Sequence, residues 1–221
     1  MKKPRCAQCK SKPCKQGTTN EKTLPAFCPM IHYRDLVKEV KKKYSSSDIR
    51  HFYLMSARTE KDSYDTQAAR EQNRTVPVRP RIREIAAFAE AIDAHKIGMA
   101  FCVGLADEAA RACSILEGHG LDISSVVCCC GAVEKTDLGI PKKLKIRDPE
   151  KFEAACNPLL QAEILNQTGT DFNLLIGLCV GHDMLFTKTS LAPVTTLIVK
   201  DRLTGHNPVI TLYSRYHKDV V

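Results

Sequence analysis

The chain has 221 residues, 43% of them hydrophobic, with a formal net charge of +8, eleven cysteines and no tryptophan. This hydrophobic content is enough for a real core, so the cysteines are not needed to make up for a small one. The few aromatic residues argue against a stacking surface for nucleic acid, and lysines and arginines interspersed with acids favour an ordinary solvated surface.

No apolar run is long enough to span a membrane, and no apolar segment follows the basic N-terminus as it would in a secretory signal. We therefore expect a cytoplasmic protein without membrane contact. In a reducing cytoplasm an odd number of cysteines does not indicate structural disulfides. Metal binding or thiol chemistry is the better interpretation of eleven cysteines.

The first cysteine-rich segment is residues 1–30, where the spacing is Cys6-x2-Cys9-x4-Cys14-x13-Cys28-Pro29. The segment has too few apolar residues to fold by burying them, but four thiolates around one metal would organise it. A Cys-x2-Cys pair is typical of zinc sites, whereas a closing Cys-Pro step is also typical of ferredoxin-type clusters. The pattern predicts a metal site, zinc or iron–sulfur. The alternative is a disordered basic tail with spare thiols.

Residues 31–80 form the second predicted part, a helical packing segment. The apolar spacing predicts one helix over 31–44 and another over 48–71, whose buried side includes Ile49, Phe52 and Tyr53. Prolines in 75–80 predict an extended link, since proline stops helices.

Residues 81–221 form the third part, in which strands and helices alternate. This alternation predicts an α/β domain, an open and mainly parallel sheet with flanking helices in a Rossmann-like three-layer arrangement. One of the helices begins after Asn157 as N-cap, with Pro158 at its first position. The expected strands are 96–101, 122–127, 172–178 and 194–199, with 209–213 as a candidate edge strand.

Thiols follow three of these strands at their carboxyl ends. Cys102 and Cys179 each precede Val-Gly, and the run Cys128-Cys129-Cys130 follows the second strand. Alternation along an extended chain would put Cys128 and Cys130 on one side, with Cys129 as the spare. The carboxyl ends of parallel strands lie side by side and form the usual ligand crevice, so we expect a cysteine-lined site there.

Cys156 joins this set because it lies just before the helix that begins at Pro158, where the free amides and the helix dipole favour a thiolate. Cys113 has the spacing of a buried helix residue and is not expected to be a ligand. Because free cysteine is among the most buried residue types, the alternative is that all these thiols are core residues.

Four polar residues near the same edge complete the candidate site. His182 and Asp183 follow Cys179-Val-Gly, where His182 is a candidate acid, base or ligand and Asp183 is a candidate catalytic group or a helix N-cap. Lys200 and Arg202 follow the fourth strand and are candidates for binding an anionic substrate or cofactor.

Together these motifs resemble an uncharacterised prokaryotic family, found largely in anaerobes, of cysteine-rich proteins thought to bind metal. The resemblance implies metal binding and no established reaction. The residues that carry it are Cys6-x2-Cys9, Cys28-Pro29, Ala100-Phe101-Cys102-Val103-Gly104-Leu105, Ala155-Cys156-Asn157-Pro158, Gly177-Leu178-Cys179-Val180-Gly181-His182-Asp183 and Val199-Lys200-Asp201-Arg202.

The first functional hypothesis is an iron–sulfur protein with a redox or electron-transfer role, acting with a small anionic substrate or a redox partner protein. Its predicted metal ligands are Cys6, Cys9, Cys14, Cys28, Cys102, Cys128, Cys130, Cys156 and Cys179. The alternative is a zinc protein with a structural four-cysteine site and a catalytic thiol, Cys179 or Cys156 with His182, in sulfur or acyl transfer. The residues leave open whether the protein is an enzyme.

Overall fold

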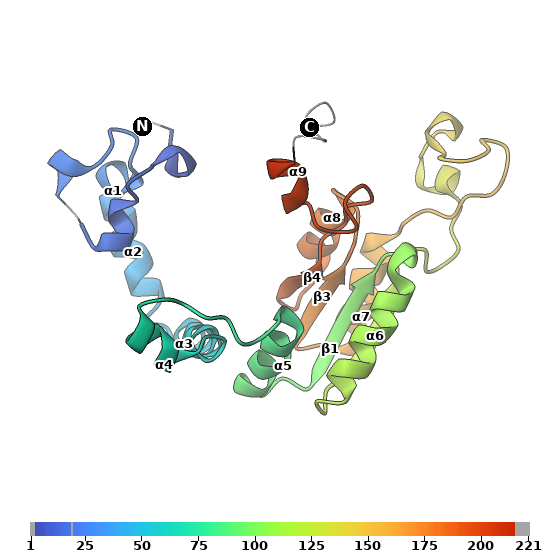
Figure 1. Cartoon of the computed structure of the whole chain (residues 1–221). Helices are drawn as coiled ribbons and strands as arrows, with labels where there is room; N and C mark the ends of the chain where they lie inside the picture. Colours follow the sequence, from blue (N-terminus) through green and yellow to red (C-terminus); the bar gives the residue numbers. More distant parts are fainter. Residues whose placement is uncertain (1–2, 19, 215–221) are drawn as a thin grey trace. The chain divides into compact units, whose positions relative to one another are not determined.

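The computed structural model describes residues 3–18 and 20–214 (Figure 1). The chain divides into two compact units, Met1–Arg58 and Thr59–Val221. The division falls within helix α3 (Ser47–Asp62). Each unit is described in turn.

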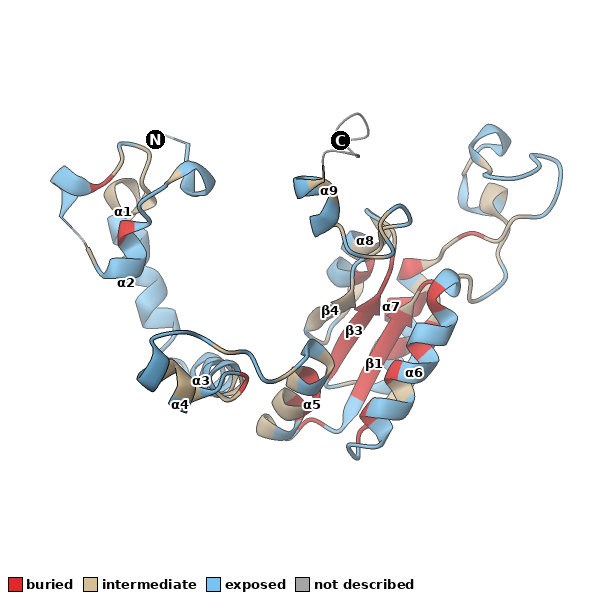
Figure 2. Cartoon of the chain, viewed as in Figure 1, coloured by how far each residue is buried: buried red, intermediate tan, exposed pale blue. Residues whose placement is uncertain are grey.

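The first unit consists of short turns and two longer helices with almost no interior. Only Pro13 and Leu24 are buried among its described residues, and the rest are half-buried or exposed (Figure 2). Its elements are η1 (Cys6–Gln8), η2 (Pro13–Gln16), η3 (Glu21–Thr23), α1 (Pro29–His32), α2 (Arg34–Lys43) and the first part of α3.

The apolar side chains of α2 and α3 are exposed, contrary to the expectation of a buried helical side. Ile49, Phe52 and Tyr53 are all exposed, as are Leu36 and Val37 on α2. The periodicity predicts an amphipathic helix but not what covers its apolar face, because that depends on distant parts of the chain.

The single helix expected over 48–71 is wrong, since the chain forms α3 and then α4 (Thr66–Gln72). Asp65 separates the two helices, because its carboxylate accepts hydrogen bonds from the backbone amides of Gln67 and Ala68 and so caps α4. The linking backbone also pairs with the extended segment that follows, where the amide of Asp65 donates to the carbonyl of Val76 over 2.8 Å.

The second unit is an α/β domain built on one sheet of four parallel strands in the order β2-β1-β3-β4. The α/β class, the parallel sheet and the Rossmann-like layering predicted from the sequence are confirmed. The strands are β1 (Lys96–Phe101), β2 (Asp122–Val127), β3 (Phe172–Ile176) and β4 (Val194–Ile198). The helices are α5 (Arg81–Ala91), α6 (Ala106–Glu117), α7 (Pro158–Thr168), α8 (His182–Thr189) and α9 (Val209–Tyr213).

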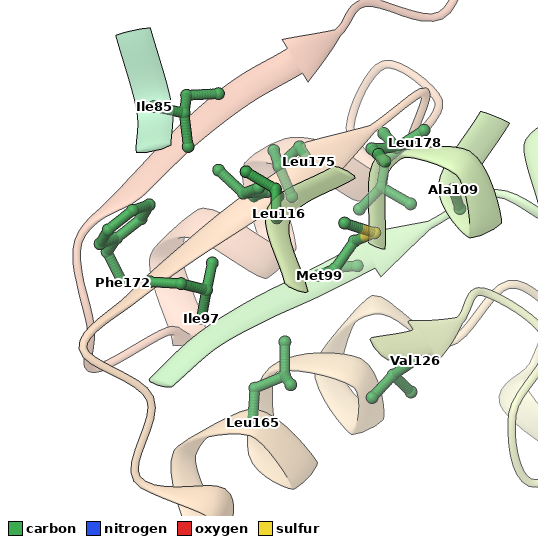
Figure 3. Close-up of a cluster of buried hydrophobic side chains, with 14 of the residues drawn as sticks. Ile85, Ile97, Met99, Ala109, Leu116, Val126, Leu165, Phe172, Leu175 and Leu178 are labelled. Atoms are coloured by element: carbon green, nitrogen blue, oxygen red, sulfur yellow. The ribbon is translucent and has the colours of Figure 1, made fainter. Parts of the chain in front are cut away.

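The core lies between the sheet and its helices. The five residues of β3 are all buried, as expected for a central parallel strand covered on both faces. Along β1, a Cβ on Gly98 would collide with Leu165 of α7, whereas the sulfur of Met99 contacts Cys113 of α6. Successive residues of the strand therefore face different helical layers, and Figure 3 shows Leu116 and Leu165 on opposite sides of β1.

Residues 209–213 form the helix α9, so the expected edge strand is wrong. Thr211 Oγ1 donates to the carbonyl of Pro208 three residues earlier, which is typical of a threonine within a helical turn. The outer edge of β4 is instead capped by Arg81, whose guanidinium donates to the carbonyl of Thr196 and the hydroxyl of Thr195, each over 2.7 Å. None of the helices in the described part of the chain combines the length and apolarity needed to cross a membrane.

Candidate functional site

The carboxyl ends of the four strands form one edge of the sheet, which we call the rim: Cys102, Cys128, Cys156, Cys179, Lys200 and Arg202. Cys102 follows β1 and Cys128 follows β2 directly. Backbone hydrogen bonds continue the sheet into both residues, since the amide of Cys102 donates to Ile176 and that of Cys128 donates to Phe101. The strands β1 and β2 therefore place their first following residues side by side, next to the end of β3.

Cys179 reaches the rim through a turn that requires glycine. Gly177 has φ of +63°, and a Cβ there would lie 2.7 Å from Leu105 Cδ1. The amide of Gly177 still donates to Ile198 on β4, so the turn begins within the sheet. A side chain at this position would displace the buried Leu105 and, with it, the connection that follows β1.

Cys156 comes from a distant part of the sequence and is held against the end of β2. The amide of Asn157 donates to the carbonyl of Cys128 over 2.7 Å. Asn157 then caps α7, because its Oδ1 accepts from the amide of Leu160, with Pro158 at the first helical position. The predicted helix start is confirmed, and it places Cys156 beside the N-terminus of α7.

The pKa values of the Cys128 and Cys156 thiols are shifted in opposite directions. A hydrogen bond from Cys128 lowers the pKa of Cys156, despite burial and the negative charges of Cys179 and Cys102, and Lys135 adds to the lowering. The same hydrogen bond, together with burial, raises the pKa of Cys128, although the amide of Val103 donates to its sulfur over 3.3 Å. Of the two thiols, Cys156 is therefore the one whose thiolate form is favoured, and Cys128 is the one whose protonated form is favoured.

The other two rim thiols each face a cation. Lys200 Nζ lies 3.2 Å from Cys102 Sγ, and Arg202 donates through a guanidinium nitrogen to Cys179 Sγ over 2.9 Å. Both cations leave the end of β4, as the sequence predicted, but they contact sulfur. Positive charge at these positions stabilises negative charge on a set of thiolates.

His182 and Asp183 lie at the start of α8, directly after Cys179. The amide of His182 donates to the carbonyl of Cys179 over 2.9 Å. The Asp183 carboxylate accepts from the amides of Gly181 and Met184, so it fixes the turn between Cys179 and α8. The expected N-cap role of Asp183 is wrong, because Gly181 holds that position and Asp183 is already the second residue of α8.

The run of three cysteines is a turn, so the extended conformation expected for it is wrong. The amide of Cys130 donates to Val127 and that of Ala132 donates to Cys129, which folds the chain back at once. Of the three, Cys128 is the buried rim thiol. Cys130 is half-buried against the core, where burial raises its pKa, and its neighbours Cys129 and Cys128 raise it further.

Cys113 lies away from the rim on α6. It is half-buried and packs against the core, with its sulfur 3.6 Å from that of Met99. Burial raises its pKa, with a further contribution from Glu117. This placement suits a packing residue, and it makes Cys113 a useful control for experiments on the rim.

The four N-terminal cysteines lie in the first unit, where all four thiols are free. Cys6 and Cys9 are joined by a tight turn in which the amide of Cys9 donates to the carbonyl of Cys6. Lys12 Nζ donates to the carbonyls of both residues. Cys28 caps the short α1, with Pro29 at its first position.

The donor set of each cysteine group suits soft, thiophilic metals, for which thiolate is the preferred ligand. Over residues 3–18 and 20–214, no three histidine, cysteine or carboxylate side chains are gathered so closely that they could hold a single metal ion.

Three residues that matter at the rim were missed by the sequence reasoning. Gln161 on α7 is fully buried and donates to the carbonyls of Val126 and Phe101, at the ends of β2 and β1. Its Oε1 accepts no hydrogen bond from residues 3–18 and 20–214. Lys135 and Glu153 form a largely buried ion pair in the loop that precedes Cys156. In the sequence, the only sign of these roles was a glutamine within a helix of mainly apolar residues.

Comparison with known proteins places the chain in a family. A family model described as "Protein of unknown function (DUF1847)" matches residues 28–197. The chain is also 37% identical over 214 residues to "Uncharacterized protein MJ0455" of Methanocaldococcus jannaschii, covering 96% of this chain and 95% of that protein. The family match spans the helical segment and the four rim cysteines, so the chain belongs to the DUF1847 family of proteins of unknown function.

Proposed function

We propose that the rim holds an iron–sulfur cluster through Cys102, Cys128, Cys156 and Cys179, and that the protein has a redox or electron-transfer role. The observation that carries the proposal is the convergence of four thiols from four separate segments on one edge of a parallel sheet. The pKa of Cys156 depends on the other three thiols, so the four are close enough to interact electrostatically. Four cysteine thiolates are the usual ligands of such clusters.

The charges at the rim support a cluster. Lys200 and Arg202 each face a sulfur atom and would offset the negative charge of four thiolates. A single zinc ion needs its sulfur ligands at about 2.3 Å, whereas a cluster spreads its thiolates around several metal and sulfide atoms.

A bound cluster would supply one-electron redox chemistry. The residues of the chain would hold it and set access to it. Lys200 and Arg202 would also favour the approach of a small anionic substrate or an acidic face of a redox partner protein, because they leave the edge strand β4. His182 stands at the start of the helix after Cys179, beside the rim.

For the first unit we propose a separate metal bound by Cys6, Cys9, Cys14 and Cys28. Its role would be structural, since this unit buries only two of its described residues. A metal that binds only the folded form would provide the free energy of folding that the missing core does not.

The test is the iron and sulfide content of the full chain purified without oxygen, with its visible spectrum. We expect iron, acid-labile sulfide and a broad absorption band, all reduced by Cys179→Ala and unchanged by the matched control Cys113→Ala. Equal loss in both variants would indicate general unfolding. Absence of iron and sulfide from the wild-type chain would contradict the proposal.

A second candidate function is thiol chemistry at the rim, with zinc confined to the first unit. The lowered pKa of Cys156 favours it, because the thiolate is the nucleophile in sulfur or acyl transfer. Cys179 beside His182 is the other candidate nucleophile. Selective alkylation of one rim thiol in a colourless, zinc-containing protein would support this function, whereas equal labelling of all four would count against it.

A further inference from the structure

We infer that Cys156 and Cys128 form a reversible dithiol–disulfide pair that exchanges with low-molecular-weight disulfides when the rim is free of metal. This activity goes beyond the proposed function, because it needs only these two thiols. It would also make oxidation and metal binding at the rim mutually exclusive, and only this consequence depends on the proposed cluster.

The backbone holds the two cysteines together independently of their side chains. The amide of Asn157 donates to the carbonyl of Cys128, and that of Ala155 donates to Val133 over 2.8 Å. An isolated antiparallel bridge between Glu134 and Ala154 continues this pairing. Because the bond between Asn157 and Cys128 sets the two cysteines side by side on adjacent backbone, a bond between their sulfur atoms needs little backbone movement.

The segment between them, residues 129–155, is a self-contained loop that we call the insertion (yellow in Figure 1). Its interior is made of ion pairs. Lys135 pairs with Glu153, and Lys145, the most deeply buried of these side chains, lies 3.1 Å from Glu134. Glu153 also accepts from the amide of Arg147. These bonds fix the two ends of the insertion, so the Cys128–Cys156 pair stays in register.

The two thiols differ in access. Cys128 is buried, with only 3% of its surface exposed, whereas Cys156 is half-buried and opens onto the rim. A small disulfide can reach Cys156 but not Cys128, which assigns the first attack to Cys156 and the second to Cys128. The half-buried position at the base of the insertion suits a slim substrate better than the surface of a folded protein.

The exchange balances in atoms and electrons. The Cys156 thiolate attacks one sulfur of the disulfide R–S–S–R, forms a mixed disulfide and releases one thiolate. Cys128 then gives up its proton and attacks the Cys156 sulfur, which releases the second thiolate and closes the Cys128–Cys156 bond. The two released thiolates take up the protons. The protein is oxidised by two electrons and the small disulfide is reduced to two thiols.

The test uses the full chain, reduced and freed of metal by chelation, with oxidised glutathione as the probe. We expect about two glutathione thiols released per chain and a peptide map containing the Cys128–Cys156 disulfide. The Cys128→Ser variant should accumulate a glutathione adduct on Cys156, and Cys156→Ser should release no thiol through this pair. Cys113→Ser is the matched control and should behave as the wild-type chain does.

A map that shows another pair, or an adduct on Cys156 that persists in the wild-type chain, would overturn the inference. The map of the wild-type chain needs no variant to fold, so the test stands even if a substitution disrupts the domain. Metal content, measured separately on the anaerobic protein, distinguishes the two proposals. Iron without the disulfide would contradict only this inference, and the disulfide without iron would contradict only the proposed cluster.

Discussion

The two cysteine groups of this protein lie in opposite structural settings. The rim thiols stand at the end of a sheet whose central strand is buried throughout, and backbone bonds of that sheet place them. The N-terminal cysteines lie in a unit where only Pro13 and Leu24 are buried among the described residues. The rim is thus a site at the edge of a packed core, whereas the N-terminal group needs a bound metal to complete its fold.

Metal binding and folding should therefore be coupled differently in the two units. At the rim the thiols should stay in place without metal, since packing holds the strands that carry them. In the first unit the metal and the fold should be lost together.

Removal of metal by a strong chelator should separate the two units most clearly. Structural zinc contributes about 10 to 16 kcal/mol in small zinc-dependent folds, which is more than a unit without a core can replace. We expect limited proteolysis to cut within residues 1–58 after chelation while residues 81–198 stay protected. Equal protection of both regions would show that the first unit folds without metal.

Truncation of apolar side chains should affect only the second unit strongly. Leu174 on β3 is fully buried, so Leu174→Ala should lower the free energy of unfolding by about 2 to 5 kcal/mol. Leu36 on α2 is 50% exposed, so Leu36→Ala should change the free energy of unfolding by at most about 0.5 kcal/mol. Denaturant titration of each variant measures both effects. A comparable loss in Leu36→Ala would reveal a partner surface that covers α2.

Loss of a cation at the rim should weaken ligand binding without unfolding the domain. Arg202→Gln removes the donor to Cys179 Sγ, and partners outside the metal's own ligands typically contribute about 10-fold to affinity. We expect iron to be lost to a competing chelator about 10-fold more readily, with thermal stability unchanged. Arg111→Gln, an exposed residue of α6, is the matched control, and it should have no effect.

The smallest expected effect is a loss of stability of the insertion at acidic pH. Hydrogen bonding to Lys135, with the amides of Arg147 and Ile146, lowers the pKa of Glu153 to about 2. Since the value in an unfolded chain is about 4.3, the stabilisation is complete above about pH 4 and is lost as the pH falls towards 2. The protection of the Ile146 and Arg147 amides against hydrogen exchange should follow this range.

The variant Glu153→Gln separates this effect from general acid unfolding. It should show weaker protection of the same two amides at neutral pH and no further loss between about pH 4 and 2. If the variant retains the acid dependence of the wild-type chain, the Lys135–Glu153 pair does not hold the insertion.

The sequence predicts the second unit well because its signals are local. The strands at 96–101 and 122–127 have the predicted bounds, and Asn157 caps α7 as expected. The positions of Cys102, Cys128 and Cys179 follow from the rule that carboxyl ends of parallel strands share an edge. The fold class, and with it the edge at which chemistry is expected, needs no information beyond apolar periodicity.

The features that the sequence did not predict depend on distant contacts. The pairing of Cys156 with Cys128 requires the backbone bond across the whole insertion, and the contact of Lys200 with Cys102 joins two strand ends. The helix α9 and the break at Asp65 arise from competition among backbone partners, which propensity alone does not decide. The exposure of α2 likewise depends on what the rest of the chain covers.

The most direct test of the cluster at the rim is a comparison of two fourfold variants of the full chain, both purified without oxygen and analysed for iron, zinc and acid-labile sulfide. One replaces Cys102, Cys128, Cys156 and Cys179 with serine, and the other replaces Cys6, Cys9, Cys14 and Cys28. We predict that iron and sulfide disappear from the first variant and persist in the second. Iron and sulfide that persist in the rim variant, or that are lost only from the N-terminal variant, would contradict a cluster at the rim.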